Sequence, residues 1–112
     1  MMNEKGNAMK YEVFQINLTD SEYDVPSIRN QYLDTMMKPT AKAIIAARGL
    51  YKKVATIEAM TFEQVFEIGN IGPEDKIKRH ARMHSVSVGD VIVREDGECK
   101  FVDSFGFGSV AF

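Results

Sequence analysis

The stretch SVSVGDVIVREDGECKFVD, residues 85–103, decides the fold. Valines alternate with other residues on both sides of Gly89-Asp90, as in a strand with one buried face, and we expect a bulge or bend at this pair to reverse the face. Asp96-Gly97 then predicts a tight two-residue turn, because both residues tolerate a positive φ. Residues 100–102 pair back, which predicts a C-terminal β-hairpin.

Two earlier stretches also predict strands. From Tyr11 to Leu18 one side of the alternation is strongly apolar, and the pattern stops at Thr19-Asp20-Ser21, where side chains favour caps and turns. Residues 50–60 form the second strand, with Val54 and Ile57 as its β-branched apolar residues.

Helical spacing occupies the segment between these two strands. Apolar residues recur about every four positions from 26 to 37, and Pro26 suits a first helical turn. Pro39 disfavours helical geometry in the residue before it and predicts a break. A second helix is expected over 41–48, with Gly49 as its C-terminal cap.

Two shorter helices are expected after the second strand. Thr61 offers an N-cap oxygen and Gln64 stands at the capping-box spacing. The helix that follows should run to Gly69-Asn70 and bury Phe62, Val65, Phe66 and Ile68. Pro73 begins a favourable first turn for another helix, expected to end near Arg82.

These elements predict an α+β fold: a small mixed or mostly antiparallel sheet of about four strands, helices on one face, and a C-terminal β-hairpin. The 112 residues are a common size for one domain. Residues 1–9 lack a periodic pattern and are expected to form a flexible tail, with a single α+β domain over 10–112.

Composition narrows the class of protein. With 45% hydrophobic and 27% charged residues, the chain is typical of a globular domain rather than a disordered or membrane protein. No apolar run approaches the roughly 20 residues that cross a bilayer, and we expect no secretory signal. Cys99 is the only cysteine, which favours a reducing, cytoplasmic location. A net charge of −2 does not favour a dedicated nucleic-acid binder.

Part of the chain resembles a known family. MHSVSVGDVIV at 83–93 and FVDSFGF at 101–107 are similar to the closing signature of YodL-like domains, which are small domains of bacterial chromosomes, plasmids and phages. The resemblance covers roughly residues 61–109, including the preceding helix. No catalytic residues are established for that family, so none are carried over. The resemblance implies an accessory role in a phage or mobile element, acting on a host component.

One basic run is a candidate binding site. The run consists of Lys76, Lys78, Arg79, His80, Arg82 and His84. We expect Lys76, Arg79 and Arg82 to be its binding residues, in a patch for phosphate or an acidic protein partner. The alternative is a solvated helix face, with Ile77 and Ala81 turned inward.

The C-terminal aromatic residues are the second candidate. Phe105 and Phe107 either close the core, which scattered aromatics usually do, or one of them lies exposed as an anchor for a partner. Residues 104–109 are glycine-rich, but no helix follows them, so they do not form a phosphate-binding loop.

The sequence contains only weak indications of metal binding or catalysis. His80 and His84 are spaced as a metal pair on a helix, yet no second pair exists, and they equally suit a helix end. Acidic neighbours should raise the pKa of the Cys99 thiol and leave it unreactive. Neither a nucleophile–base pair, nor paired acid–base carboxylates, nor a cofactor motif is recognisable. We therefore expect no metal, no cofactor and no enzymatic activity.

The functional expectation is a non-enzymatic accessory or binding protein of a phage or mobile element, acting on a host protein and not on a membrane. The alternative is a small nucleic-acid-binding module that uses the basic segment 76–84.

Overall fold

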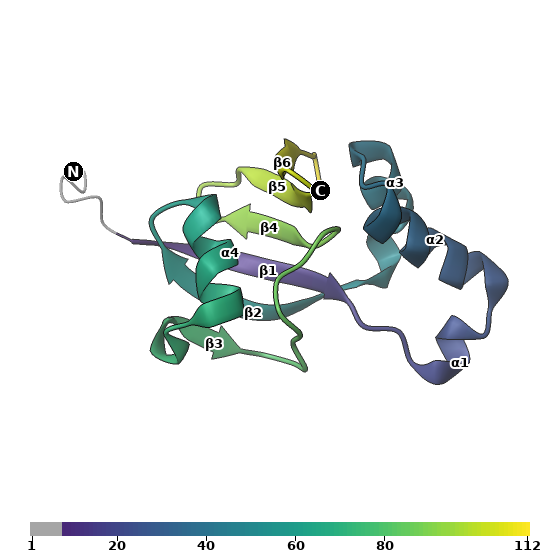
Figure 1. The fold of residues 1–112 in the computed structure, drawn as a ribbon, viewed down its shortest axis with the longest axis horizontal. Helices are drawn as coiled ribbons and strands as arrows, with labels where there is room; N and C mark the ends of the chain where they lie inside the picture. The colour runs from purple at the N-terminus through teal and green to yellow at the C-terminus, as the bar shows by residue number, and fades with distance from the viewer. Residues whose placement is uncertain (1–7) are drawn as a thin grey trace.

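The computed structural model describes residues 8–112. They form one six-stranded sheet in the order β3-β2-β1-β4-β5-β6, with every neighbouring pair antiparallel (Figure 1). The strands are β1 (Met9–Ile16), β2 (Tyr51–Ala59), β3 (Ile77–Arg79), β4 (Val91–Arg94), β5 (Cys99–Asp103) and β6 (Gly106–Ser109). The helices are α1 (Asp20–Tyr23), α2 (Pro26–Met37), α3 (Ala41–Ala46) and α4 (Phe62–Ile71), with 3-10 turns η1 (Arg48–Leu50) and η2 (Glu74–Lys76).

The α+β class and the C-terminal hairpin are confirmed, but the sheet has six strands rather than about four. Both additional strands are short and lie at the edges. The helix predicted from Pro73 to Arg82 is wrong: only η2 is helical there, and β3 follows at once. Because Ile77 pairs with Ile57 of β2 and packs against the core, an edge strand partly buries the one large apolar side chain of this segment.

The hairpin differs in detail from its prediction. Strand β4 begins at Val91 rather than Ser85, because the Asp90 N–H donates to the Ser87 carbonyl at 3.0 Å and closes a turn. Arg94 and Glu98 are still joined by a backbone hydrogen bond, so the loop between them has three residues, 95–97, rather than two. The Gly97 N–H donates to the Arg94 carbonyl, and the Arg94 N–H donates to the Glu98 carbonyl, each at 2.8 Å. Gly97 is the one residue of this loop with a positive φ, of 97°. This pattern belongs to a turn followed by a left-handed bulge residue.

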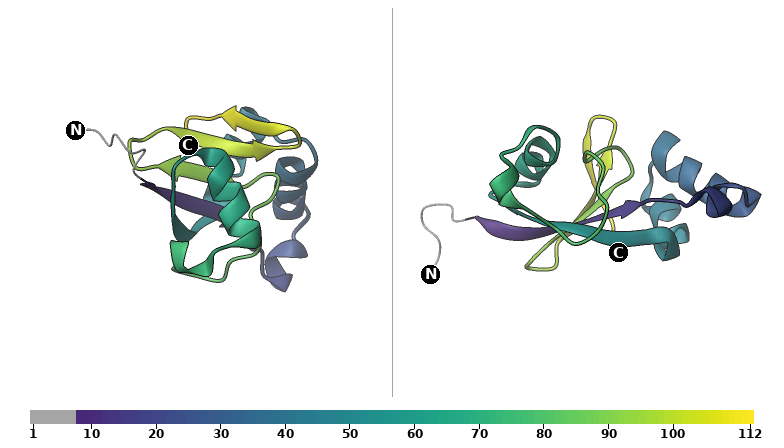
Figure 2. Two further views of the ribbon diagram at one scale, coloured as in Figure 1. Left: turned by 60° about the vertical axis from the view of Figure 1, so that its left-hand side comes forward. Right: turned by 90° about the horizontal axis from the view of Figure 1, so that it is seen from below.

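Two apolar clusters fill the two faces of the sheet. Successive strand residues point to opposite faces, so Ile92 and Val102 join the cluster under α4, while Val91 and Phe101 join the opposite one. Helix α4 lies across the first face (Figure 2) and buries Phe62, Val65 and Ile68, whereas Phe66 is exposed. The second cluster takes Ile44 from α3 and Val110 from the C-terminal segment, so helices contact both faces of the sheet and not the single face expected.

Local signals set the helices. Thr61 caps α4 as predicted: its Oγ1 accepts from the Gln64 N–H at 3.0 Å, and the Gln64 side chain accepts from the Met60 N–H at 2.8 Å. Helix α2 spans the predicted 26–37, and Pro26 stands in its first turn. Gly49 has no positive φ, so the predicted glycine cap of α3 is wrong and Ala47 ends that helix.

Helices α1–α3 stand beyond the end of the sheet where β1 ends (Figures 1 and 2). At the other end, β1 begins at Met9, which pairs with Ala59, while residues 1–7 of the expected tail lie outside the described residues. Within residues 8–112, no helix is both long and apolar enough to cross a membrane.

Candidate functional site

The three residues of the predicted basic patch do not lie on a shared face. Lys76 ends η2, Arg79 ends β3, and Arg82 lies in the loop after β3. Arg79 donates two hydrogen bonds to the Glu74 carboxylate, at 2.5 and 3.2 Å, and each group shifts the other's pKa toward the charged form. Its charge is therefore compensated inside the segment.

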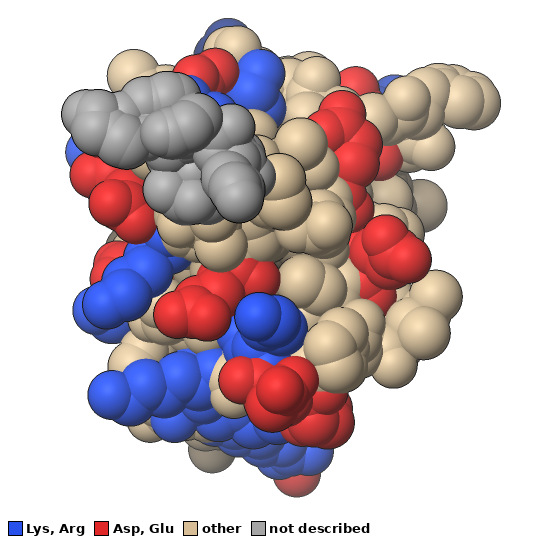
Figure 3. All heavy atoms as spheres, turned by 90° about the vertical axis from the view of Figure 1, so that its left-hand side faces the viewer, with Lys and Arg blue, Asp and Glu red and all other residues tan. Residues whose placement is uncertain are grey.

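The remaining basic residues separate onto two surfaces. Lys76 lines a shallow hollow of about 390 Å³ with Lys10, Lys78 and His80, where Glu12, Glu58 and Asp75 also lie. Figure 3 shows this mixture: Lys and Arg gather along the lower edge of the view, where β3 lies, with Asp and Glu beside them. Arg82 lines a different cleft.

The two histidines of the predicted metal pair have different hydrogen-bond partners. His80 Nε2 lies 2.8 Å from Thr56 Oγ1 on the sheet, whereas His84 Nδ1 lies 2.8 Å from the Ser85 carbonyl. Among residues 8–112, no three His, Cys, Asp or Glu side chains group closely enough to hold a metal ion.

The C-terminal aromatics take opposite roles. Phe107 packs against the core under α4, with its ring centroid 6.0 Å from that of Phe62. Phe105 is fully exposed, at 101%, in the two-residue loop between β5 and β6. The expected core position is therefore wrong for Phe105, since the turn carries it past the last paired residues.

Phe105 stands beside an unprotected sheet edge. Edge strands usually carry charges that discourage pairing with another chain, and β3 does so with Lys78 and Arg79. Strand β6 has the sequence Gly-Phe-Gly-Ser and no charge. Gly108 is required there, because a Cβ at this position would collide with the Phe101 ring.

The free backbone groups of β6 can be assigned. The Val110 N–H donates to the Cys99 carbonyl at 3.3 Å, and hydrogen-bonded pairs alternate with non-bonded pairs along an antiparallel ladder. Phe107 and Ser109, which stand opposite Val102 and Lys100, therefore point their N–H and C=O groups away from β5.

A hollow of about 230 Å³ lies next to this edge, between α4 and the β5–β6 hairpin. Phe66 and Phe107 supply apolar walls, and Val102 lies at its base. Glu63 and Asp103 line the same hollow, which makes its rim acidic.

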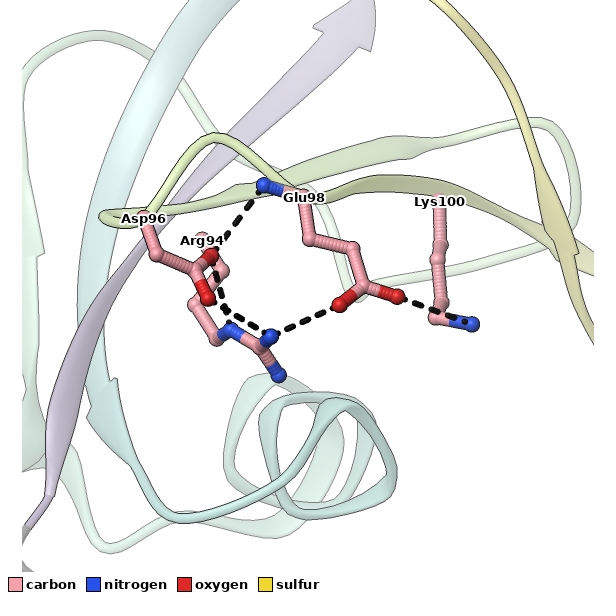
Figure 4. Close-up of polar contacts among 4 residues, drawn as sticks. All are labelled: Arg94, Asp96, Glu98 and Lys100. Atoms are coloured by element: carbon pink, nitrogen blue, oxygen red, sulfur yellow. Dashed lines mark hydrogen bonds and ion pairs between the residues drawn. The ribbon is translucent and has the colours of Figure 1, made fainter.

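The β4–β5 hairpin is held by its own charges (Figure 4). Arg94 donates to Asp96 at 2.9 and 2.8 Å and to Glu98 at 2.7 Å, and Lys100 lies 3.5 Å from Glu98. The Arg94 and Lys100 cations lie 5.3 and 5.5 Å from the Phe62 ring centroid, covering this core residue. These contacts link the two strands of the hairpin across its loop.

A larger cleft of about 650 Å³ lies at the other end of the sheet, between the end of β1, Lys52 of β2, Tyr32 of α2 and the 81–84 loop. Among its lining residues, Arg82 and His84 were candidates from the sequence, whereas Lys52 and Tyr32 were not. No spacing in the sequence links these positions, since only the folded sheet brings them together.

A buried polar network holds the backbone of His84, one of the residues that line this cleft. The Gln15 side-chain amide donates to Asp90 Oδ2 and to the His84 carbonyl, each at 2.9 Å, while its oxygen accepts from the His84 N–H at 3.1 Å. The Tyr51 hydroxyl donates to the Gly89 carbonyl at 2.5 Å. Burial raises the Asp90 pKa to about 6, although hydrogen bonds from Ser87 and Gln15 oppose the shift.

Comparison with known proteins finds no matching family model, no matching curated protein and no matching solved structure. What the chain binds therefore has to follow from its own surfaces.

Proposed function

We propose that this chain is a protein-binding module that takes up an extended segment of a partner protein along β6, with Phe105 as an anchor. In the setting implied by the YodL-like resemblance, it is a non-enzymatic accessory protein of a phage or mobile element, and the partner is a host protein inside the cell. The observation that carries the proposal is the fully exposed Phe105 next to an uncharged sheet edge.

Strand addition suits this edge. A partner strand gains affinity from main-chain hydrogen bonds and specificity from pockets for alternate side chains. Phe107 and Ser109 offer the backbone groups, and the hollow between α4 and the hairpin offers the pocket. Since β6 has only four residues, the pocket and Phe105 must supply much of the binding.

The chemistry of the hollow selects the segment. Phe66 and Phe107 favour an apolar side chain, and Glu63 and Asp103 favour a Lys or Arg beside it. We therefore assign the occupant as an extended segment with an apolar residue flanked by a basic one. The nucleic-acid alternative has weaker support, because Arg79 is ion-paired and Lys76 and Arg82 line different hollows.

A random peptide library displayed on a carrier tests this assignment. We expect the full chain to enrich peptides with adjacent apolar and basic residues, and the amide resonances of Phe107 and Ser109 to shift on adding a selected peptide. F105A and S109P should each lower the affinity for that peptide at least tenfold. S109P removes an outward-pointing backbone N–H and leaves the hydrogen bonds between β6 and β5 intact.

I71A is the matched control, because Ile71 is 83% exposed on α4 but does not line the hollow. Circular dichroism verifies folding of each variant. Enriched peptides that bind F105A and S109P as tightly as the parent would refute the proposal. So would light scattering that shows a dimer dissociated by S109P, because β6 would then be covered by a second copy.

A further inference from the structure

The cleft at the end of β1 concentrates positive charge. This charge comes from Lys52 of β2 and Arg82 of the 81–84 loop, which both line the cleft. No Asp or Glu of the described chain is among its lining residues, although the whole sequence has 16 acidic against 14 basic residues. Within residues 8–112, Lys52 and Arg82 form no ion pair.

The neighbouring carboxylates are engaged elsewhere. Glu22 of α1 accepts from the Thr19 N–H at 2.8 Å, and this bond, more than the nearby Lys52, lowers its pKa. Asp90 is buried behind the cleft and held by Gln15 and the Ser87 N–H. Neither carboxylate lines the cleft, so Lys52 and Arg82 are the charged side chains that a ligand there would contact, although the ionised Glu22 near Lys52 offsets part of the Lys52 charge.

The cleft is also built to hold more than an inorganic anion. Its volume of about 650 Å³ lies within the range of small-molecule sites. The partly exposed side chains of Leu18 and Met83 give it an apolar wall, and Tyr32 adds an aromatic ring with a hydroxyl group.

The cationic loop is fixed in place before any ligand arrives. The Asn17 side chain donates to the Arg82 carbonyl at 2.9 Å, and Gln15 holds both backbone groups of His84. Such preorganisation lowers the entropy that binding must overcome.

We propose that this cleft binds a free mononucleotide, with Lys52 and Arg82 on the phosphate and the base against Tyr32 and the apolar wall. A phosphomonoester matches two cations that line one cleft, and a planar base matches an aromatic and apolar surface. The site shares no lining residue with the hollow beside β6, so it is independent of the proposed protein binding.

Isothermal titration with AMP, adenosine and inorganic phosphate separates the two halves of this site. We expect AMP to bind at least tenfold more tightly than either fragment. R82Q and K52Q should each lower the affinity for AMP at least tenfold and leave the affinity for adenosine unchanged. The matched controls K53Q and K78Q remove the same charge from neighbouring positions outside the cleft and should bind AMP normally.

Three results would overturn the proposal: AMP binding no tighter than adenosine or phosphate, equal losses in the control variants, or a 5′-phosphorylated hexanucleotide binding more tightly than AMP. The last result would assign the cleft to a nucleic-acid end. F105A should bind AMP like the parent, which keeps failure of this site distinguishable from failure of the β6 site.

Discussion

The Gln15 side chain and the Asp90 carboxylate, 75 residues apart in the sequence, are joined by a buried hydrogen bond of 2.9 Å. This bond ties the turn before β4 to the central strand β1. It also places a carboxylate where burial opposes its ionisation, which raises the Asp90 pKa from 3.8 to about 6.

The first prediction is a pH dependence of stability that originates at Asp90. Because the folded pKa is raised, the folded state binds more protons than the unfolded state between pH 4 and 6, so this contribution decreases as the pH rises through that range. The full difference corresponds to about 3 kcal/mol, at 1.36 kcal/mol for each pH unit.

D90N cannot ionise and should lack this component. Urea unfolding at pH 4, 5, 6 and 7 checks the prediction, because the difference between the two proteins cancels the other carboxylates. The variant should gain stability relative to the parent as the pH rises from 4 to 6. Two parallel pH profiles would show that Asp90 ionises as it does in the unfolded chain.

The second prediction compares two glycines. Gly108→Ala should lower the free energy of unfolding by about 1–3 kcal/mol, because the new methyl group meets the ring of Phe101, which is itself packed in the second core cluster. Gly49→Ala is the control, since a Cβ there meets nothing within 4 Å and the backbone φ is not positive. Gly49→Ala should leave the free energy of unfolding unchanged or raise it slightly. Denaturant unfolding of both variants measures the difference.

The third prediction concerns the hairpin loop. Gly97 has a φ of 97° and open space around it, so Gly97→Val adds backbone strain without a collision. We expect a loss of about 1–3 kcal/mol, visible as a Tm lowered by several degrees. Gly97→Asn should lose less, because Asn tolerates positive φ better. Indistinguishable melts of the Val variant and the parent would mean that the loop relaxes at no cost.

The fourth prediction separates the two C-terminal phenylalanines by stability. Phe107→Ala removes a ring packed on Phe62 and should cost about 2 kcal/mol. Phe105→Ala removes a fully exposed ring and should change stability by less than about 0.5 kcal/mol. Thermal unfolding of both variants checks this, and a clear loss in Phe105→Ala would place that ring in the core after all.

Elements with strong local signals could be predicted from the sequence. Helix α2 follows from its apolar spacing and Pro26, α4 from the cap at Thr61, and β2 from its β-branched apolar residues. The chemistry that sets these elements lies within a few residues of each position. Gly97 likewise marked the hairpin, although the loop holds three residues rather than two.

The edge strands, the aromatic positions and the cleft depend on distant partners. Residues 77–79 become β3 because β2 offers a free edge to pair with, which overrides the helical spacing of the basic run. Phe105 and Phe107 differ in exposure because only Phe107 stands opposite β5. Lys52 and Arg82 line one cleft because β2 and the loop after β3 lie at the same end of the sheet. The sequence by itself determined the class of fold and the central elements, since local energies set them. Tertiary structure alone decided which charges and aromatic rings face solvent together, because strand pairing sets those positions.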